Sequence, residues 1–361
     1  MNEMALVLQG GGALGAYEYG VVCKLVEMGW KPVAVTGVSI GAVNAAAIAG
    51  AKNGDIGASL DRVWKAITLE TLPWLPASMQ GNLSLLGNPN FWRSRTDYLQ
   101  MASWDSLCST APMVDTLLSS LDFSQLNDSN HMRMAVTATS LRTGGPTTFS
   151  NYLADDAHEQ TDGHQALQDI ITPAHILASG ALPPGFPAVR IDDCAYWDGG
   201  LFSNTPIDAL LNLLEPHEIE NLPIFTVDLF RTDGLAAPQN LIDVQTRALA
   251  LQYENRFWAA YGGEAQLAGF LDMLVQLDEA LPSDSAVRKN RAYAWLRRLR
   301  ALKNIQIIEG APAAAGSGND FSAYGVRMAY EAGRAAAATF RPGSIQPPQL
   351  HAVHGATPAA A

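Results

Sequence analysis

Residues 5–51 read ALVLQGGGALGAYEYGVVCKLVEMGWKPVAVTGVSIGAVNAAAIAGA, and the order of patterns in this stretch decides the fold. A short apolar run at its start predicts a buried strand, and the glycines after it lead into a helical pattern from about Ala13 to Met28. A second apolar run at 32–37 predicts another strand, and the alanine-rich residues that follow, to about Ala51, are strong helix formers. This succession predicts an α/β protein whose central sheet is mostly parallel.

The rest of the chain continues the pattern with less regularity. Further buried strands are predicted at 132–140 and 222–229, and a pair of helices that a proline kinks or separates is predicted at 166–179. Prolines and glycines break the stretch 71–110, while large apolar side chains recur in it, which predicts a long apolar flap.

The apolar patterns also suggest where one unit ends and the next begins. The α/β domain is expected to close near the end of the last strand and to span 1–230, with a mostly helical extension at 231–340. The proline- and alanine-rich tail at 341–361 has no period, so we expect it to be disordered. Within the extension the patterns predict helices at about 240–261, 263–280, 285–303 and 320–340 and a strand at 305–309.

Composition limits the class of partner. Hydrophobic residues make up 48% of the chain and charged residues 16%, which predicts a globular protein with a sizeable core. The net charge is −12 and the sequence pI is about 5.0, and this argues against nucleic acid as a partner, because phosphate neutralisation needs a basic surface. Neutral esters, lipids and thioesters remain open as substrates.

Cysteine usage and the N-terminal residues bear on location. Cys23, Cys108 and Cys194 lie far apart and lack CxxC or histidine-rich spacing, so neither a disulfide framework nor a metal site is expected. A reducing, cytoplasmic compartment fits this usage. The N-terminal residues lack the basic flank and the length of a signal peptide, and no apolar run reaches about 18 residues, so no membrane span is expected.

A serine stands in the turn between the second predicted strand and the helix after it. Gly37-Val38-Ser39-Ile40-Gly41 matches the pattern G-x-S-x-G, in which glycines keep side chains away from a sharply turned serine. The helix that begins after Ser39 directs its partial positive end at the hydroxyl, which favours a nucleophilic oxygen. A merely structural glycine turn is the alternative to a catalytic serine.

The glycines Gly10-Gly11-Gly12-Ala13-Leu14-Gly15 also satisfy the dinucleotide pattern G-x-G-x-x-G. That function needs an acidic residue at the end of the second strand, where this chain has the serine turn instead, and the nearby acids Glu18 and Glu27 fall on the preceding helix. We therefore expect no dinucleotide or other cofactor. Consecutive N–H groups at a helix N-terminus suit an oxyanion hole better, with a structural turn as the alternative.

A nucleophilic serine needs a base, and the chain offers two candidates. His217 follows in the order of serine, acid and histidine known from α/β-hydrolases, but the residues around it, PHEIE, predict a polar surface loop. Asp198 in YWDGGL ends an apolar stretch, and Gly199 and Gly200 let the chain turn tightly after it. An ordinary aspartate pKa of ~3.9 is too low for an efficient base, so an apolar setting must raise it.

Three blocks of this sequence resemble those of patatin-like phospholipases, in that family's order and spacing. They are GGGALGAYEYGV at 10–21, GVSIG at 37–41 and DGG at 198–200, and ASGALPPGFP at 178–187 resembles the family segment that leads to the aspartate. The resemblance covers about residues 5–230, and NDFSAYG at 319–325 resembles part of an extension of unknown function in a bacterial subgroup.

The resemblance implies a three-layer α/β/α domain and a serine acyl-ester hydrolase without metal or cofactor. It implies a catalytic dyad of Ser39 and Asp198, and one departure is Leu14, where many members carry Arg or Lys. The oxyanion hole would be formed by Gly10, Gly11, Gly12 and Ala13, and the supporting motif positions would be Gly15, Gly37, Gly41, Gly199 and Gly200.

Other functions and partners stay open at this point. An acyltransferase would use the same serine with an alcohol or thiol in place of water, and a non-catalytic lipid- or acyl-binding protein would keep the glycine loop alone. The flap at 71–110 and the basic helix at 285–303 suggest peripheral membrane contact, although a solvated basic face packed on the core explains the helix better. The sequence does not determine the oligomeric state.

Overall fold

The computed structural model describes residues 2–70, 87–155, 160–161, 164–230, 237–239, 244, 247–248, 251–253, 264–310 and 318–340. The first part of the predicted flap, most of the helix predicted at 240–261 and the tail at 341–361 lie outside the described residues.

A mostly parallel sheet forms the centre of the protein, so the predicted α/β class is confirmed. Within the described residues ten strands join in this sheet, with the main order β12-β11-β1-β2-β5-β6-β8-β7, and the first five of these strands run parallel to one another. The strands are β1 (Asn2–Leu8), β2 (Trp30–Gly37), β5 (Arg133–Ser140), β6 (Pro146–Ser150), β7 (Gln160–Thr161), β8 (His164–Gln168), β9 (Val189–Ile191), β10 (Cys194–Asp198), β11 (Ile224–Asp228) and β12 (Ile305–Glu309).

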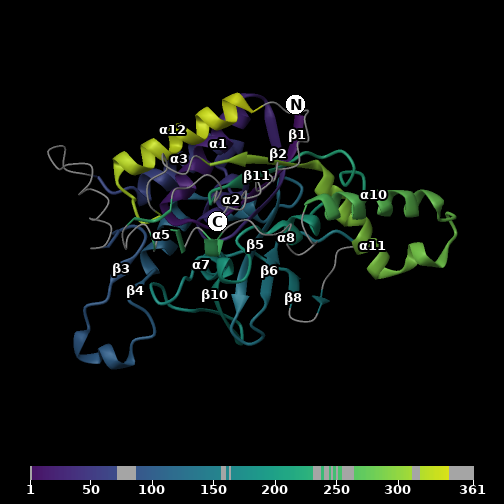
Figure 1. Cartoon of the computed structure of the whole chain (residues 1–361). Helices are drawn as coiled ribbons and strands as arrows, with labels where there is room; N and C mark the ends of the chain where they lie inside the picture. Colours follow the sequence, from purple (N-terminus) through teal and green to yellow (C-terminus); the bar gives the residue numbers. More distant parts are fainter. Residues whose placement is uncertain are drawn as a thin grey trace, which may run out of the picture.

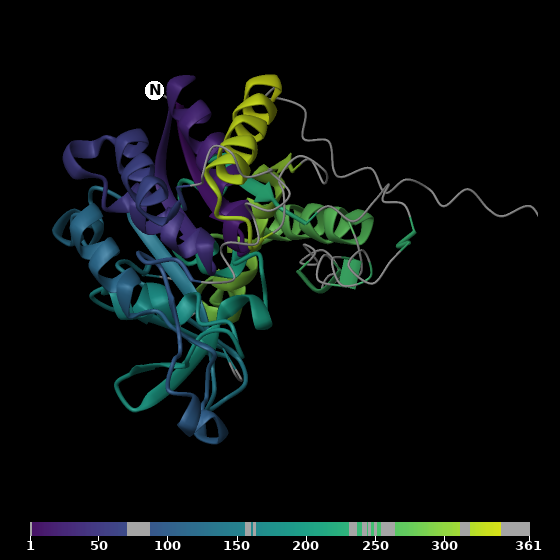
Figure 2. The ribbon, with the colours of Figure 1, turned by 90° about the vertical axis from the view of Figure 1, so that its left-hand side faces the viewer.

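Helices cover both faces of the sheet, which makes three layers (Figures 1 and 2). Each face of the sheet has its own apolar core, because successive side chains of a strand point to opposite faces. Along β1, Met4, Leu6 and Leu8 belong to one apolar cluster and Ala5 and Val7 to the other. The first cluster is completed by α1 (Gly15–Glu27), α2 (Ile40–Ala49), α3 (Ile56–Ile67), α5 (Ala111–Ser120), α6 (Phe123–Leu126), α7 (Pro173–Ser179) and α12 (Ala323–Thr339). The second is completed by α8 (Ile207–Leu211), α10 (Glu264–Ala280), α11 (Arg291–Arg298) and the turn Leu299–Asn304.

The C-terminal residues take part in the same sheet and the same layers. β12 pairs in parallel with β11 along its whole length, and α12 packs against α1. An added Cβ on Gly333 would lie 2.0 Å from the Tyr17 carbonyl oxygen, and one on Gly20 would lie 2.0 Å from that of Tyr330, so the two helices cross backbone to backbone. The domain boundary near residue 230 stays a prediction.

Two predicted elements differ from the structure. The helix pair predicted at 166–179 is wrong in its first half, where β8 pairs with β6, and α7 begins only at Pro173. The ring of Pro173 disfavours helical backbone in the residue before it and needs no N–H at the start of a helix, so the proline begins this helix rather than dividing one. The helix predicted at 285–303 is broken at Asn290, which accepts a hydrogen bond from the Ala292 N–H and caps α11.

The described part of the flap forms a narrow arm. β3 (Arg93–Ser94) pairs antiparallel with β4 (Cys108–Ser109), and a 3-10 helix at Tyr98–Ser103 lies at its tip, at the lower left of Figure 1. Among the helices that the structure describes, none is long and apolar enough to cross a membrane. The described residues also contain no group of three or more His, Cys, Asp or Glu side chains placed to hold a metal ion.

The close crossing of α1 and α12 yields a stability prediction. Gly333→Ala places a methyl group against backbone and should lower the free energy of unfolding by ~1–3 kcal/mol, the usual effect of overpacking. The matched control is Gly269→Ala in α10, where an added Cβ meets nothing within 4 Å and the better helix propensity of alanine should add ~1 kcal/mol. Urea unfolding followed by circular dichroism measures both, and equal effects at the two positions would contradict the close crossing.

Candidate active site

Ser39 lies in a strained turn between β2 and α2. Its backbone has φ 56° and ψ −124°, a region that a residue with a side chain enters only at a cost of ~1–3 kcal/mol. The Ser39 N–H donates to two oxygens of Ser179, the carbonyl oxygen at 3.0 Å and Oγ at 3.1 Å. A Cβ on Gly37 would lie 2.2 Å from the Gly41 carbonyl oxygen, which explains why this motif carries glycines.

The sheet topology brings Asp198 to this turn. β2 pairs with β5 as far as Gly37 and Val136, while β6 occupies the other edge of β5. β5 runs on beyond the end of β2, and β10 pairs antiparallel with that free length, with Asp198 opposite Ala138. The aspartate therefore arrives beside the turn that follows the end of β2, and the Ser39 hydroxyl lies close enough to lower the pKa of its carboxyl group.

The carboxyl group of Asp198 is buried in a way that changes its acidity. Its side chain is 2% exposed, and Oδ1 accepts a hydrogen bond from the Gly200 N–H at 2.7 Å. Burial raises the pKa of Asp198 to about 6, while the hydrogen bonds from Ser39 and Gly200 act in the opposite direction. The structure thus places a weakly acidic carboxyl group against the serine hydroxyl.

The glycine loop after β1 lies against the serine. β1 ends beside β2, with Leu8 opposite Gly37, and a Cβ on Gly10 would be 2.9 Å from the Cβ of Ser39. Because the loop runs into α1, its N–H groups stand at a helix N-terminus close to the nucleophile. The motifs Gly10–Gly15, Gly37–Gly41 and Asp198–Gly200 therefore meet at one place.

Two of the four predicted oxyanion donors have acceptors within the protein. The Gly10 N–H donates to Oδ1 of Asn204 at 3.0 Å. The Ala13 N–H donates to the carbonyl oxygen of Gly318 at 2.7 Å. Among the described residues none accepts from the N–H groups of Gly11 and Gly12, so these two can face a bound oxyanion.

Asn204 is a residue that the sequence did not single out. Its side-chain amide makes two bonds to Gly10, since Nδ2 also donates to the Gly10 carbonyl oxygen at 3.0 Å. It thereby ties the segment after Asp198 to the glycine loop. No local pattern marks this residue, because its partner lies 194 positions away.

A buried polar network lies beneath the loop. Glu18 lies on α1 and accepts hydrogen bonds from the Gln9 N–H at 2.6 Å and from Asn44 Nδ2 at 2.9 Å. Trp64 Nε1 donates to the side-chain Oδ1 of Asn44 at 2.8 Å. Burial raises the pKa of Glu18 to about 8. This network joins β1, α1, α2 and α3 below the site.

Comparison with known proteins assigns the chain to a family. A family model described as patatin-like phospholipase matches residues 6–211, which is more than half of the chain. The chain belongs to the patatin-like phospholipase family. This membership places it broadly among lipid acyl hydrolases. No curated protein sequence matches the chain.

Two solved structures are similar to this patatin-like chain at low identity. VipD from Legionella pneumophila is 16% identical with a TM-score of 0.39, and the match covers 94% of this chain and 67% of that one. A chain of the heterodimeric ExoU–SpcU complex from the type III secretion system of Pseudomonas aeruginosa is 14% identical with a TM-score of 0.26, and the match covers 83% and 68%. The family assignment rests on the sequence match and not on these structures.

His217 stands apart from the patatin-like site. It is exposed in the turns after α8, and the next residue, Glu218, forms a buried ion pair with Arg133 at 2.5 Å. Arg133 begins β5 and lies at the amino end of the parallel strands, whereas Ser39 follows the carboxyl end of β2. The two candidate bases therefore lie at opposite ends of the parallel strands, and Asp198 is the one at the serine's end.

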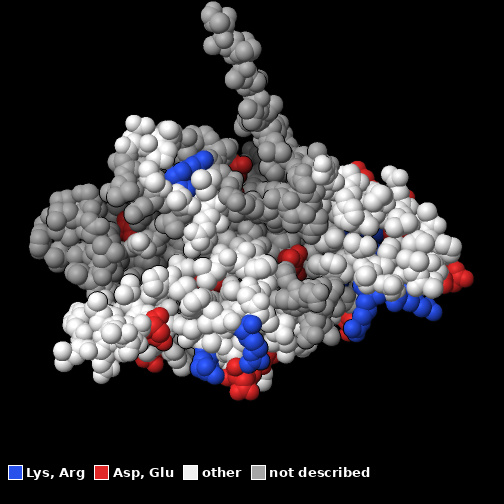
Figure 3. All heavy atoms as spheres, turned by 60° about the horizontal axis from the view of Figure 1, so that its bottom comes forward, with Lys and Arg blue, Asp and Glu red and all other residues white. Residues whose placement is uncertain are grey.

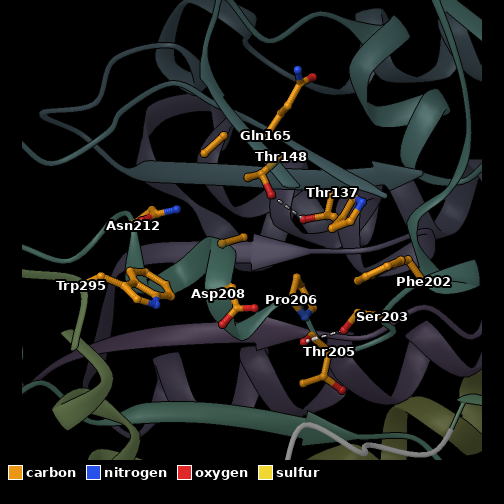
Figure 4. A pocket seen from close by; sticks show the side chains of 13 residues that line it. Thr137, Thr148, Gln165, Phe202, Ser203, Thr205, Pro206, Asp208, Asn212 and Trp295 are labelled. Atoms are coloured by element: carbon orange, nitrogen blue, oxygen red, sulfur yellow. Dashed lines mark hydrogen bonds between the residues drawn. The ribbon is translucent and has the colours of Figure 1, made fainter. Parts of the chain in front are cut away.

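A pocket of about 240 Å³ opens on the sheet face that carries α8 (Figure 4). None of the predicted site residues lines it. Its hydroxyl groups bond within the protein, Thr137 with Thr148 and Ser203 with the Thr205 carbonyl oxygen, while Phe202 and Trp295 add aromatic walls. The pocket therefore lies outside the group formed by the three motifs.

Proposed function

We propose that this protein hydrolyses acyl esters of lipids, with Ser39 as nucleophile and Asp198 as its base. The observation that carries the proposal is the position of Ser39, which caps α2 in a strained turn, beside the buried carboxyl group of Asp198 at the end of β10. A hydroxyl group becomes nucleophilic when a base can take its proton, and here the proposed base lies beside it.

The proposed reaction has two halves. Asp198 accepts the proton as Ser39 Oγ attacks the ester carbonyl, and the N–H groups of Gly11 and Gly12 donate to the resulting oxyanion. The protonated carboxyl group then gives its proton to the leaving alcohol. Water attacks the acyl-serine in the second half, with Asp198 again as base, and releases the free acid.

The acidity of Asp198 supports this role. A general base is most effective when its pKa lies near the working pH, and an exposed aspartate falls well below that range. Burial brings the pKa of Asp198 to about 6, so the group is largely ionised near neutrality and still basic enough to take a proton. No second base is required by this geometry.

We further propose that the arm formed by residues 93–109 contacts lipid. Its apolar side chains face solvent, Leu99 fully and Tyr98 to 68%. Figure 3 shows the side of the molecule that is at the bottom of Figure 1, and uncharged residues cover most of the described surface there. Contiguous exposed apolar groups of this kind are typical of contact surfaces. The exposed apolar residues of the arm are Tyr98, Leu99, Met101 and Leu107.

The base of the arm is joined to the loop beside the nucleophile. The N–H groups of Leu107 and Cys108 donate to the carbonyl oxygens of Pro184 and Gly185, both at 2.9 Å. The same loop begins at Gly180, where an added Cβ would lie 3.8 Å from the Ser39 Cα. The base of the arm is therefore connected through this loop to the proposed nucleophile.

The basic segment 285–303 is a weaker candidate for lipid contact. Asp278 alone pairs with Arg288, Arg297 and Arg300, and Lys303 pairs with Asp272. Arg298 is fully buried and donates to the carbonyl oxygens of residues that end α8. Most of these charges are thus engaged within the protein, which favours the packed basic face.

The dyad yields the first prediction of this proposal. Ser39→Ala should abolish ester hydrolysis and labelling by a fluorophosphonate probe, and Asp198→Asn should lower kcat by roughly 10²–10⁴, the usual contribution of a positioned base. The matched control is Asp192→Asn in the exposed β9–β10 turn, where asparagine tolerates the positive φ and activity should not change. A kcat near that of wild type in Asp198→Asn would rule out the dyad.

The same analysis predicts a pH dependence. Protonated Asp198 cannot accept the serine proton, so kcat/KM on a soluble ester should rise with pH through about 6 and then level off. His217→Ala should leave this profile unchanged. A profile that shifts in His217→Ala, or that shows no rise between pH ~5 and 8, would contradict a carboxylate base.

The arm yields a third prediction. The double substitution Leu99→Ser and Met101→Ser should weaken co-sedimentation with phosphatidylcholine vesicles by tenfold or more, about 1.4 kcal/mol, and leave hydrolysis of a soluble short-chain ester intact. The control is Met273→Ser with Leu277→Ser, an exposed apolar pair on α10. Equal loss of vesicle binding in both double variants would exclude a specific role for the arm.

Two outcomes would redirect the functional proposal. Diversion of the acyl group from free acid to an added alcohol would identify an acyltransferase that uses the same serine. Absence of fluorophosphonate labelling at Ser39 would identify a non-catalytic lipid- or acyl-binding protein.

A further inference from the structure

Two glycine segments from opposite ends of the chain are in backbone contact at the proposed oxyanion hole. The Gly318 carbonyl oxygen accepts the Ala13 N–H at 2.7 Å. Gly12 has φ +58°, and a Cβ there would lie 2.2 Å from the Gly318 carbonyl oxygen. A Cβ on Gly318 would in turn lie 2.9 Å from the carbonyl oxygen of Gly11. No side chain fits between the two segments.

The segment that carries Gly318 is firmly anchored on α3. Leu69 exchanges two backbone hydrogen bonds with it, donating to the Phe321 carbonyl oxygen at 2.8 Å and accepting from the Ala323 N–H at 3.1 Å. Phe321 is 3% exposed and stacks with Trp64. Ser322 caps α12 by accepting from the Gly325 N–H at 3.1 Å. The Gly318 carbonyl group is therefore presented from a fixed support.

The helix that follows this segment, α12, packs along α1. α1 begins at the end of the glycine loop, and α12 crosses it at Gly20 and Gly333. At the other end of α1, Arg334 makes two hydrogen bonds to Glu27, at 2.6 and 2.8 Å. The C-terminal region thus contacts the loop itself and the whole length of the helix into which it runs.

A loop of three glycines needs such support. Glycine has more conformational freedom to lose than other residues, and the loop has no side chains at these positions to fix it. Oxyanion donors act only when they lie ~2.7–3.1 Å from the developing charge, and a displacement of ~1 Å in an active site can lower the rate by ~10². The anchoring of Ala13 decides where the neighbouring N–H groups point.

We propose that Gly318 is a positioning residue for the oxyanion hole. The proposal rests on the proposed ester hydrolysis by Ser39. It gives the C-terminal extension a task in catalysis, because its backbone saturates the Ala13 N–H and leaves the N–H groups of Gly11 and Gly12 fixed toward the substrate.

The experiment compares Gly318→Ala with Arg334→Gln in the full-length protein. Gly318→Ala moves the carbonyl group away from the loop, whereas Arg334→Gln weakens the α1–α12 contact at the end far from the site. We expect kcat on a soluble ester to fall by tenfold or more in Gly318→Ala with KM unchanged. The inhibition constant of a trifluoromethyl ketone, which forms a tetrahedral oxyanion on a serine, should rise by the same factor. Arg334→Gln should change neither value.

Hydrogen exchange measures the bond between the Ala13 N–H and the Gly318 carbonyl oxygen independently of activity. Exchange of the Ala13 amide should become faster in Gly318→Ala and stay slow in Arg334→Gln. Faster exchange with unchanged kcat and ketone affinity would show a contact without a positioning role and would overturn the proposal. Unchanged exchange and unchanged kcat would show that the contact is not made in solution, with the same consequence.

Failure of the underlying function is recognised separately. If the wild-type protein neither hydrolyses esters nor binds the ketone through Ser39, the proposed hydrolysis fails and the positioning role fails with it. If the wild-type protein does both and only Gly318→Ala behaves like wild type, the hydrolysis stands and the positioning role alone is lost.

Discussion

The left-handed backbone of Ser39 is the constraint on which the rest of the site depends. The turn exists because α2 packs so closely on the ends of β1 and β2 that a Cβ on Gly41 would lie 2.5 Å from the Leu8 carbonyl oxygen. That closeness also places the glycine loop, which continues β1, against the serine. Ser179 holds the turn from a third element, α7, so the strained conformation is fixed from several directions at once.

Two buried carboxyl groups serve this arrangement in different ways. Asp198 touches the proposed nucleophile, whereas Glu18 lies below the loop and binds the Gln9 N–H and Asn44. Burial raises the pKa of both, to about 6 and about 8, above the usual values of unfolded carboxyl groups. Ionising them therefore costs folding free energy, and their contribution to stability falls as pH rises through these values. The pH range that activates Asp198 is thus one in which the fold loses stability.

The parts of the site that the sequence predicted are those with local causes. The motifs at Gly10–Gly15 and Gly37–Gly41 are short turns between a strand and a helix, and such turns have recognisable local patterns. Most of their glycines are nevertheless required by close contact with residues far along the chain. The prediction of helix at β8 is wrong because its five residues, HQALQ, have no distinctive period. Its pairing with β6 decides its conformation. Asn204 and Gly318 could not be found, because each acts on a loop that folding alone brings near.

The bonding of the glycine loop also explains how the site can work without a cation at position 14. Leu14 cannot stabilise a developing negative charge, so in the proposed mechanism that task falls to backbone N–H groups and to the N-terminus of α2. Asn204 and Gly318 engage the N–H groups of Gly10 and Ala13 on either side, and the pair between them is left for the substrate. An oxyanion hole formed by backbone dipoles depends strongly on the orientation of those dipoles. An oxyanion hole that contains a full positive charge depends less on orientation. The support that the C-terminal residues give the loop is therefore most needed in a chain that lacks the charged side chain.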